Sequence, residues 1–247
     1  MQSFWDWFRA LNDATGINLT IFYDSFDRRR FVSGFLMTLR LAAICIVASV
    51  LIGIVGAWLQ GSRLRLTRSI VHWYIQFFRN TPPLVQIYFF YFGIGSLLTA
   101  TGASGTAVPV VSNVTWAIVS LSFFAGAFNV EIFRSGVEAV PKTTIEAAES
   151  LGFSRTRTYL FIVLPLAFRI SLPALNNNLV NLVKTTTLAY AIAVPEMLYV
   201  SSQIWSDALN VPVMMNVLLL SYFLLVGFLV WVMHRWERAI KVPGFGT

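Results

Sequence analysis

Polar side chains that can donate and accept hydrogen bonds are concentrated between residues 169 and 184 of an otherwise apolar sequence. An apolar run, Leu160–Leu166, comes directly before them. The charged and amide residues of this stretch are Arg169, Asn176, Asn177, Asn178, Asn181 and Lys184. An ionised group at the centre of a bilayer costs at least ~2.5–3.5 kcal/mol. If this segment lies in a membrane, its polar groups must therefore face a partner helix or a water-filled cavity.

A second pair of charges, Glu131 and Arg134, lies near the end of another apolar segment. Residues three apart share one face of a helix. The two side chains can therefore form an ion pair within the helix, or they can contact a ligand together. The asparagines leave a similar choice, because amides also bond neighbouring helices inside membranes.

The sequence gives no indication of catalytic or metal chemistry. His72 and His234 are isolated, without an H-E-x-x-H pattern, so we expect no metal site. Cys45 is the single cysteine, which excludes an internal disulfide and a thiolate metal site. No phosphate-binding loop of the Walker A type occurs, so we expect this chain to bind no ATP itself. An intramembrane enzyme would need a nucleophile, acid or metal constellation that the sequence lacks.

The composition indicates a membrane protein. Hydrophobic residues make up 57% and charged residues 12% of the chain, and the mean hydropathy is +0.69. Soluble domains are about a quarter charged. The length allows roughly five to six spans of ~20 residues. The net charge of +7 does not indicate nucleic-acid binding, because the basic residues are dispersed between the apolar segments.

Five membrane-spanning segments are predicted, so the fold class is an all-α polytopic membrane protein. The predicted spans are about Leu41–Leu59 (with Phe31–Arg40 as an extension), Ile70–Leu98 with an interruption, Val114–Phe133, Leu160–Lys184 and Val211–Met233. Gly53 and Gly56 would let a neighbouring helix approach the first span closely. Thr99–Asn113 is predicted to be an exposed loop.

The interruption in the second span is Arg79-Asn80-Thr81-Pro82-Pro83. Paired prolines do not fit an undisturbed helix interior, because they lack an N–H and clash with the previous turn. Either the spanning helix begins near Pro82 after an interfacial segment, or one helix is broken there. Backbone groups freed at membrane depth must then face protein or water.

The distribution of basic residues predicts the orientation. Lys and Arg gather after the first and third spans and at the C-terminus, which places these segments in the cytoplasm. A separate crossing by Leu188–Val200 would move the basic C-terminus outside, so five spans are preferred to six. Arg28-Arg29-Arg30, on the predicted outer side, is an exception to the rule. The predicted divisions are a periplasmic or interfacial segment over 1–30, a transmembrane domain over 31–241 and a tail over 242–247.

The cytoplasmic loop after the third span contains a predicted short helix. Thr143-Thr144-Ile145-Glu146 has the spacing of a capping box, and Gly152 supplies a left-handed stop. A helix of about two turns is too short to be stable alone in water. It therefore needs a docking surface, unless it is only an interfacial connector.

This loop, Glu146-Ala147-Ala148-Glu149-Ser150-Leu151-Gly152 followed by Leu164-Pro165, resembles the EAA loop of ABC importer permeases. Three further segments resemble the polar amino acid uptake family of these permeases: 78–86, 131–136 and 181–188. Matching segments cover about Thr38 to Gln203. The departures are Pro83, where the family usually has Leu or Ile, and a threonine pair at 186–187 where serine is more common.

The resemblance implies a type I ABC importer permease fold, with five transmembrane helices and a cytoplasmic coupling helix, in a bacterial inner membrane. A second permease, identical or related, would complete the pathway. Two ABC ATPase subunits would bind ATP and Mg²⁺ in the cytoplasm, and a periplasmic substrate-binding protein would dock outside. The implied coupling residues are Glu146, Ala147, Ala148, Gly152 and Pro165.

The resemblance favours polar amino acids as substrates, with glutamate, glutamine or aspartate preferred. A zwitterion needs donors for its carboxylate and acceptors for its ammonium group. The residues best placed for this are Glu131, Arg134, Asn177, Asn178, Asn181 and Lys184, whereas Arg79 and Asn80 are expected to be scaffold. Another small polar solute is an alternative substrate. A channel or an ion-coupled secondary transporter is a less favoured alternative, because it would not explain a docking helix.

Overall fold

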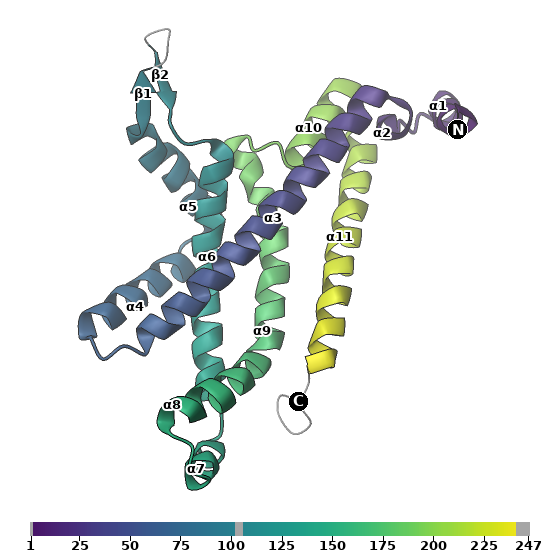
Figure 1. The fold of residues 1–247 in the computed structure, drawn as a ribbon. Helices are drawn as coiled ribbons and strands as arrows, with labels where there is room; N and C mark the ends of the chain where they lie inside the picture. Colours follow the sequence, from purple (N-terminus) through teal and green to yellow (C-terminus); the bar gives the residue numbers. More distant parts are fainter. Residues whose placement is uncertain (1, 102–105, 241–247) are drawn as a thin grey trace. The chain divides into compact units, whose positions relative to one another are not determined.

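The computed structural model describes residues 2–101 and 106–240, with side chains from Trp5 onward, and it is predominantly helical (Figure 1). The elements in order are α1 Gln2–Thr15, α2 Thr20–Tyr23, α3 Ser25–Gln60, α4 Arg65–Asn80, α5 Pro83–Tyr88, η1 Phe89–Ile94, η2 Gly95–Leu97, β1 Thr99–Thr101, β2 Ala107–Pro109, α6 Asn113–Glu138, α7 Lys142–Ser150, α8 Arg155–Thr158, η3 Tyr159–Val163, α9 Leu164–Thr185, η4 Thr186–Ile192, α10 Met197–Ala208 and α11 Val211–Ile240. The predicted tail over 242–247 lies outside the described residues.

The predicted all-α architecture with five apolar helical segments is confirmed. Within the described chain, four helical segments are long and apolar enough to cross a membrane: Ser25–Gln60, Asn113–Glu138, Arg155–Ile192 and Val211–Ile240. The fifth segment, Pro83–Leu97, is a shorter apolar helix. Its first residue is a proline, which suits the start of a helix because the missing N–H would have no helical acceptor there.

The predicted loop Thr99–Asn113 is not entirely irregular. Strands β1 and β2 pair antiparallel, with Ala100 opposite Val108, and their residues are exposed. Val110 N–H also donates to the Leu98 carbonyl (3.0 Å) and extends the pairing. Backbone hydrogen bonds alone hold this exposed pair of strands, and neither strand has a buried apolar face. The pattern of apolar residues in the sequence therefore did not predict the strands.

The chain divides into two compact units. The first contains residues 1–45, 84–120 and 183–227, and the second contains residues 46–83, 121–182 and 228–247. In the first unit, Ile21, Val200, Ile204 and Met214 form a buried apolar cluster. The first unit therefore packs the N-terminal helices against α10 and the start of α11.

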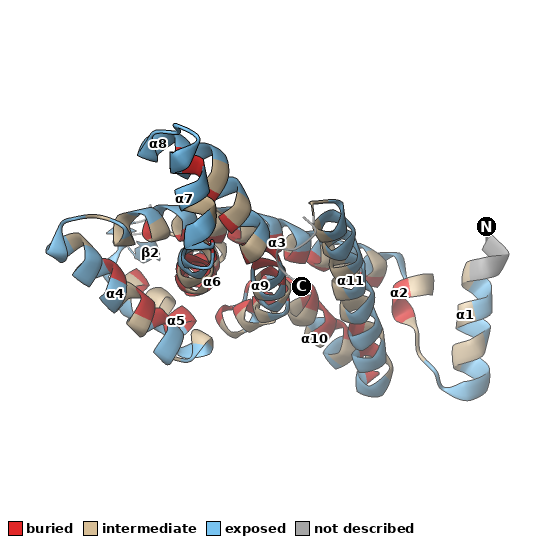
Figure 2. Ribbon diagram, turned by 90° about the horizontal axis from the view of Figure 1, so that it is seen from below, coloured by how far each residue is buried: buried red, intermediate tan, exposed pale blue. Residues whose placement is uncertain are grey.

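In the second unit, glycines let helices α3 and α6 pack closely, as the sequence predicts. A Cβ atom at Gly53 would overlap Asn129, and one at Gly56 would overlap Val130. Val130 also packs with Val71 and Ile75 of α4 in a buried cluster. Figure 2 shows the resulting buried and exposed sides of α4.

The segment Leu188–Val200 is not a spanning helix, in agreement with the rejection of a sixth crossing. Helix η4 ends at Ala193, which has a positive φ of 55°, and α10 has only 12 residues. At 1.5 Å per residue, 12 residues reach ~18 Å, short of the ~30 Å hydrocarbon core. Glu196 caps α10, and its carboxylate accepts from the backbone N–H groups of Leu198 (2.9 Å) and Tyr199 (2.8 Å).

Candidate functional site

The short helix α7 forms where the EAA-like sequence lies, but it begins earlier than the capping box predicts. Its N-cap is Pro141, whose extended backbone (ψ 133°) turns the chain into the helix. Thr144 N–H donates to the Pro141 carbonyl (3.0 Å). Thr143 is therefore already inside the first turn, and the predicted capping box of Thr143 and Glu146 is wrong.

The end of α7 agrees with the sequence. Gly152 adopts φ +86°, a conformation that costs glycine little and other residues more. Gly152 N–H donates to the Glu149 carbonyl (3.0 Å), and Phe153 N–H donates to the Ala148 carbonyl (3.1 Å). This pair of bonds is the Schellman arrangement, which satisfies the last carbonyls of a helix.

Helix α7 is attached to the fold along one side and presents the other. Ala148 is buried, and Ile145 packs on a cluster that includes Val140 and Val163. Glu146 and Ala147 are exposed on the same helix. Just beyond α7, Leu151 is 80% exposed. Ala148 therefore faces the fold, whereas Ala147 faces outward. Figure 1 shows α7 beside α8.

Pro165, the remaining predicted coupling residue, lies in the first turn of α9 and is exposed. The turn just before it, Tyr159–Val163, is a wider π-helix. Proline cannot donate the helical hydrogen bond and clashes with the preceding turn. The wide turn therefore occurs where the sequence cannot complete a regular helix.

Three of the predicted pathway residues form an exposed polar face on α9. Asn177, Asn181 and Lys184 are exposed and follow each other at intervals of four and three residues. This spacing places them on the same side of a helix. In a membrane, such a face requires water or a partner helix.

Two neighbouring amides, Asn176 and Asn178, form hydrogen bonds to other helices. Asn178 Nδ2 donates to the Asn129 side-chain oxygen (2.8 Å) and to the Ala125 carbonyl (3.1 Å), both on α6. Asn176 is buried and donates to Glu237 Oε2 (3.2 Å) on α11. These bonds join α9 to its neighbours, so the cluster contains both helix-joining and exposed members.

Glu131 and Arg134 do not pair with each other. Glu131 forms an ion pair with Arg79, and the Arg79 guanidinium lies over the Phe128 ring, 5.1 Å from its centre. Arg134 instead approaches Glu138, one turn further along α6 (3.8 Å). The predicted alternative of an intrahelical Glu131–Arg134 pair is therefore wrong. Nothing in the spacing of residues 79 and 131 could have revealed this contact.

The predicted helix break is confirmed, and it separates two helices. α4 ends at Asn80, Thr81 is extended, and α5 begins at Pro83. Asn80 Nδ2 donates to Gln76 (2.8 Å), which is consistent with its predicted scaffold role. Pro82 lies in the break itself, and Arg79 at the end of α4 provides the partner of Glu131.

Comparisons with known proteins agree on one class. Residues 49–242 match the family described as "Binding-protein-dependent transport system inner membrane component". The probable glutamine ABC transporter permease protein GlnP of Bacillus subtilis is 35% identical over 169 residues, 67% of this chain and 72% of the relative. The permease protein HisM of the Salmonella typhimurium histidine/lysine/arginine/ornithine transport system is 30% identical over 212 residues, 86% of this chain and 90% of the relative.

Solved structures show a similar fold. A chain of the crystal structure of an amino acid ABC transporter with histidines is 25% identical and has a TM-score of 0.76, covering 86% of this chain and 94% of that one. A chain of the MetNI methionine ABC transporter, in an inward-facing conformation, has a TM-score of 0.69 at 20% identity, covering 89% of this chain and 100% of that one. The second likeness concerns the fold alone.

Proposed function

Because this chain belongs to the family of binding-protein-dependent transport system inner membrane components, and is an amino acid ABC importer permease, we propose that α7 couples it to a cytoplasmic ATPase. The observation that carries this proposal is the exposure of α7. A nine-residue helix is too short to be stable alone, yet it is anchored on one side and presents Glu146 and Ala147 on another. A groove on a partner protein would complete its burial.

The proposed assembly contains a second permease, identical or related, with two ATPase subunits and a periplasmic substrate-binding protein. We place the N-terminus in the periplasm and the C-terminus in the cytoplasm, in a bacterial inner membrane, because Lys and Arg favour cytoplasmic segments. ATP and Mg²⁺ would be bound by the ATPase subunits. The relatives include two permease proteins named for one transport system of Salmonella typhimurium, HisQ and HisM, which supports a related rather than identical second permease.

The proposed mechanism is a rigid-body switch. ATP-driven closure of the two ATPase subunits would bring the two copies of α7 together, one from each permease. The burial of Ala148 and the contact of Ile145 with the fold fix α7 to its own subunit. A displacement of α7 would therefore move the helices to which it is attached, and the pathway would open on the other side.

We propose that the substrate is a polar amino acid, with glutamine, glutamate or aspartate preferred. Two similar proteins are named as glutamine transporter permeases, which supports this preference weakly. Direct substrate contacts are assigned to the exposed α9 face of Asn177, Asn181 and Lys184, which offers donors and acceptors to a zwitterion. Glu131, Arg134 and Asn178 would support this face through their contacts with Arg79, Glu138 and Asn129.

The test is reconstitution of the permease with a candidate ATPase and a candidate binding protein from the same organism. We expect accumulation of labelled glutamine or glutamate inside vesicles that requires ATP and the binding protein. Uptake that continues without the ATPase and follows an ion gradient would support a secondary transporter instead. Uptake of another small polar solute, without uptake of glutamine or glutamate, would support an ABC importer with a different substrate.

A substitution on α9 tests the proposed pathway face. We expect Asn177→Leu to lower uptake about three- to tenfold, the worth of one or two lost hydrogen bonds. Leucine is favoured in lipid, so misinsertion would not explain the loss. The matched control is Asn216→Leu, an exposed asparagine on α11 whose amide donates to its own helix (Pro212 carbonyl, 2.9 Å). Equal uptake by both variants would contradict the assignment.

A further inference from the structure

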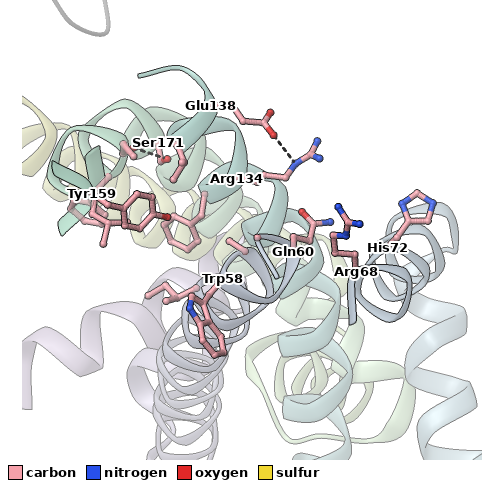
Figure 3. A pocket seen from close by; sticks show the side chains of 16 residues that line it. Trp58, Gln60, Arg68, His72, Arg134, Glu138, Tyr159 and Ser171 are labelled. Carbon is pink, nitrogen blue, oxygen red and sulfur yellow. Dashed lines mark hydrogen bonds and ion pairs between the residues drawn. The ribbon is translucent and has the colours of Figure 1, made fainter. Parts of the chain in front are cut away.

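A cavity of about 790 Å³ lies in the second unit, and apart from Arg134 its lining residues take no part in the proposed coupling or pathway. It is lined by the end of α3, the start of α4, the end of α6, and the segment from Tyr159 to Ser171 (Figure 3). The end of α6 comes just before α7 along the chain, and the Tyr159 segment follows α7 and α8. The cavity therefore lies at the same end of the second unit as the proposed coupling helix.

One part of the cavity wall is polar and rich in donors. Arg68 and His72 line it from α4, and Arg134 lines it from α6 (Figure 3). Arg134 forms a long ion pair, at 3.8 Å, with Glu138, which also lines the cavity. Arg68 and His72 are exposed on α4, so both can reach a ligand. This part of the wall carries an excess of hydrogen-bond donors and positive charge, which suits an anion.

The side chain of Gln60 adds a second observation, which concerns one of several buried polar atoms without a partner among the described residues. The Gln60 side-chain oxygen is buried and has no hydrogen-bond partner among the described residues. Gln60 lines the same cavity. Buried acceptors are normally bonded, so an orphaned one beside a cavity indicates a missing donor. The hydroxyl of a lipid headgroup could supply it.

The rest of the wall is apolar and aromatic. Trp58, Phe133 and Phe168 line it, and Trp58 is 74% exposed. Next to Arg68 along α4, Leu66 and Trp73 are also exposed. Tryptophans beside arginines at helix ends are typical of the boundary between headgroups and acyl chains. This part of the cavity therefore suits hydrocarbon.

We propose that this cavity binds one anionic phospholipid, with its phosphodiester against Arg68 and His72 and the start of an acyl chain against Trp58 and Phe168. A small soluble anion would leave the aromatic wall uncovered, whereas a zwitterionic lipid would bring its own ammonium group close to Arg68 beside the phosphate. Basic recesses between transmembrane helices bind anionic headgroups in this way. The orientation proposed above puts the lipid in the cytoplasmic leaflet, but binding itself does not depend on that orientation.

Lipid binding by the purified, delipidated full-length permease tests the proposal. Phosphatidylglycerol and phosphatidylcholine are titrated separately and bound lipid is counted by native mass spectrometry. We expect phosphatidylglycerol to bind about tenfold or more tightly than phosphatidylcholine, because one charge-assisted contact changes the affinity by about this factor. Arg68→Gln should abolish this preference. Arg65→Gln, a matched loss of an exposed arginine on the same helix that does not line the cavity, should retain it.

The outcomes distinguish other occupants. Equal effects of Arg68→Gln and Arg65→Gln would indicate general surface attraction and overturn the site. Competition by glycerophosphate at the same affinity would indicate a phosphate site without a lipid tail. A photo-crosslinking p-benzoylphenylalanine in place of Tyr159 should yield a lipid adduct, and a crosslink to a second permease instead would assign the cavity to that partner. None of these readouts is transport, so their failure leaves the proposed function untouched.

Discussion

Glu146→Ala is expected to lower ATP-driven uptake at least tenfold while the protein remains folded and inserted. Glu146 is exposed on α7, and alanine is a better helix former than glutamate. The Ser150 hydroxyl donates to the backbone carbonyl of Glu146 (2.9 Å), a bond that the substitution keeps. A lost charge-assisted bond to the ATPase would cost ~1.5–3 kcal/mol, which is at least about tenfold in affinity.

The measurement is uptake and ATP hydrolysis by the reconstituted complex at equal permease content. We expect hydrolysis to persist without stimulation by the binding protein. The control is Glu149→Ala, which removes the same charge from an exposed position three residues away on α7. Equal losses in both variants would mean that the total charge of α7 matters rather than the position of Glu146. Normal uptake by Glu146→Ala would remove the main support for coupling through α7.

Features set by neighbouring residues were predicted from the sequence. The end of α7 at Gly152 depends on the wide backbone freedom of glycine. The break at Pro82-Pro83 depends on the restricted backbone of proline. Both features are present in the structure. The five apolar segments follow from hydropathy over ~20 residues. Such features require no knowledge of how the chain folds back on itself.

Features set by distant residues were not predictable in this way. The Arg79–Glu131 and Asn129–Asn178 contacts join different helices, and their positions in the sequence have no regular spacing. The start of α7 was misplaced for a different reason. Thr143 and Glu146 satisfy the capping pattern, but Pro141 already provides an extended residue before the helix. The sequence therefore contains two possible start signals for α7, and the helix begins at the earlier one, directly after Pro141.

Loss of either charge in the Arg79–Glu131 pair is expected to destabilise the protein by about 2 kcal/mol. Removing one partner of a buried pair costs ~3–5 kcal/mol. Both side chains keep about a third of their surface exposed (37% and 31%), so solvent reduces this cost. In detergent we expect Glu131→Gln to lower the Tm by about 5 °C, since 1 kcal/mol corresponds to ~2–4 °C in a chain of this size.

Exchange of the two charges then separates the two roles open to Glu131. Arg79→Glu combined with Glu131→Arg restores the ion pair but loses the contact of the Arg79 guanidinium with Phe128. We expect most of the Tm to return, and uptake to return with it, because the pair joins α4 to α6 rather than contacting the substrate. A variant that regains its Tm but transports nothing would instead place Glu131 in the pathway. A variant that regains neither would show that the surroundings of the pair, a cavity of about 390 Å³ lined by Ser135 among others, require the native arrangement of the charges.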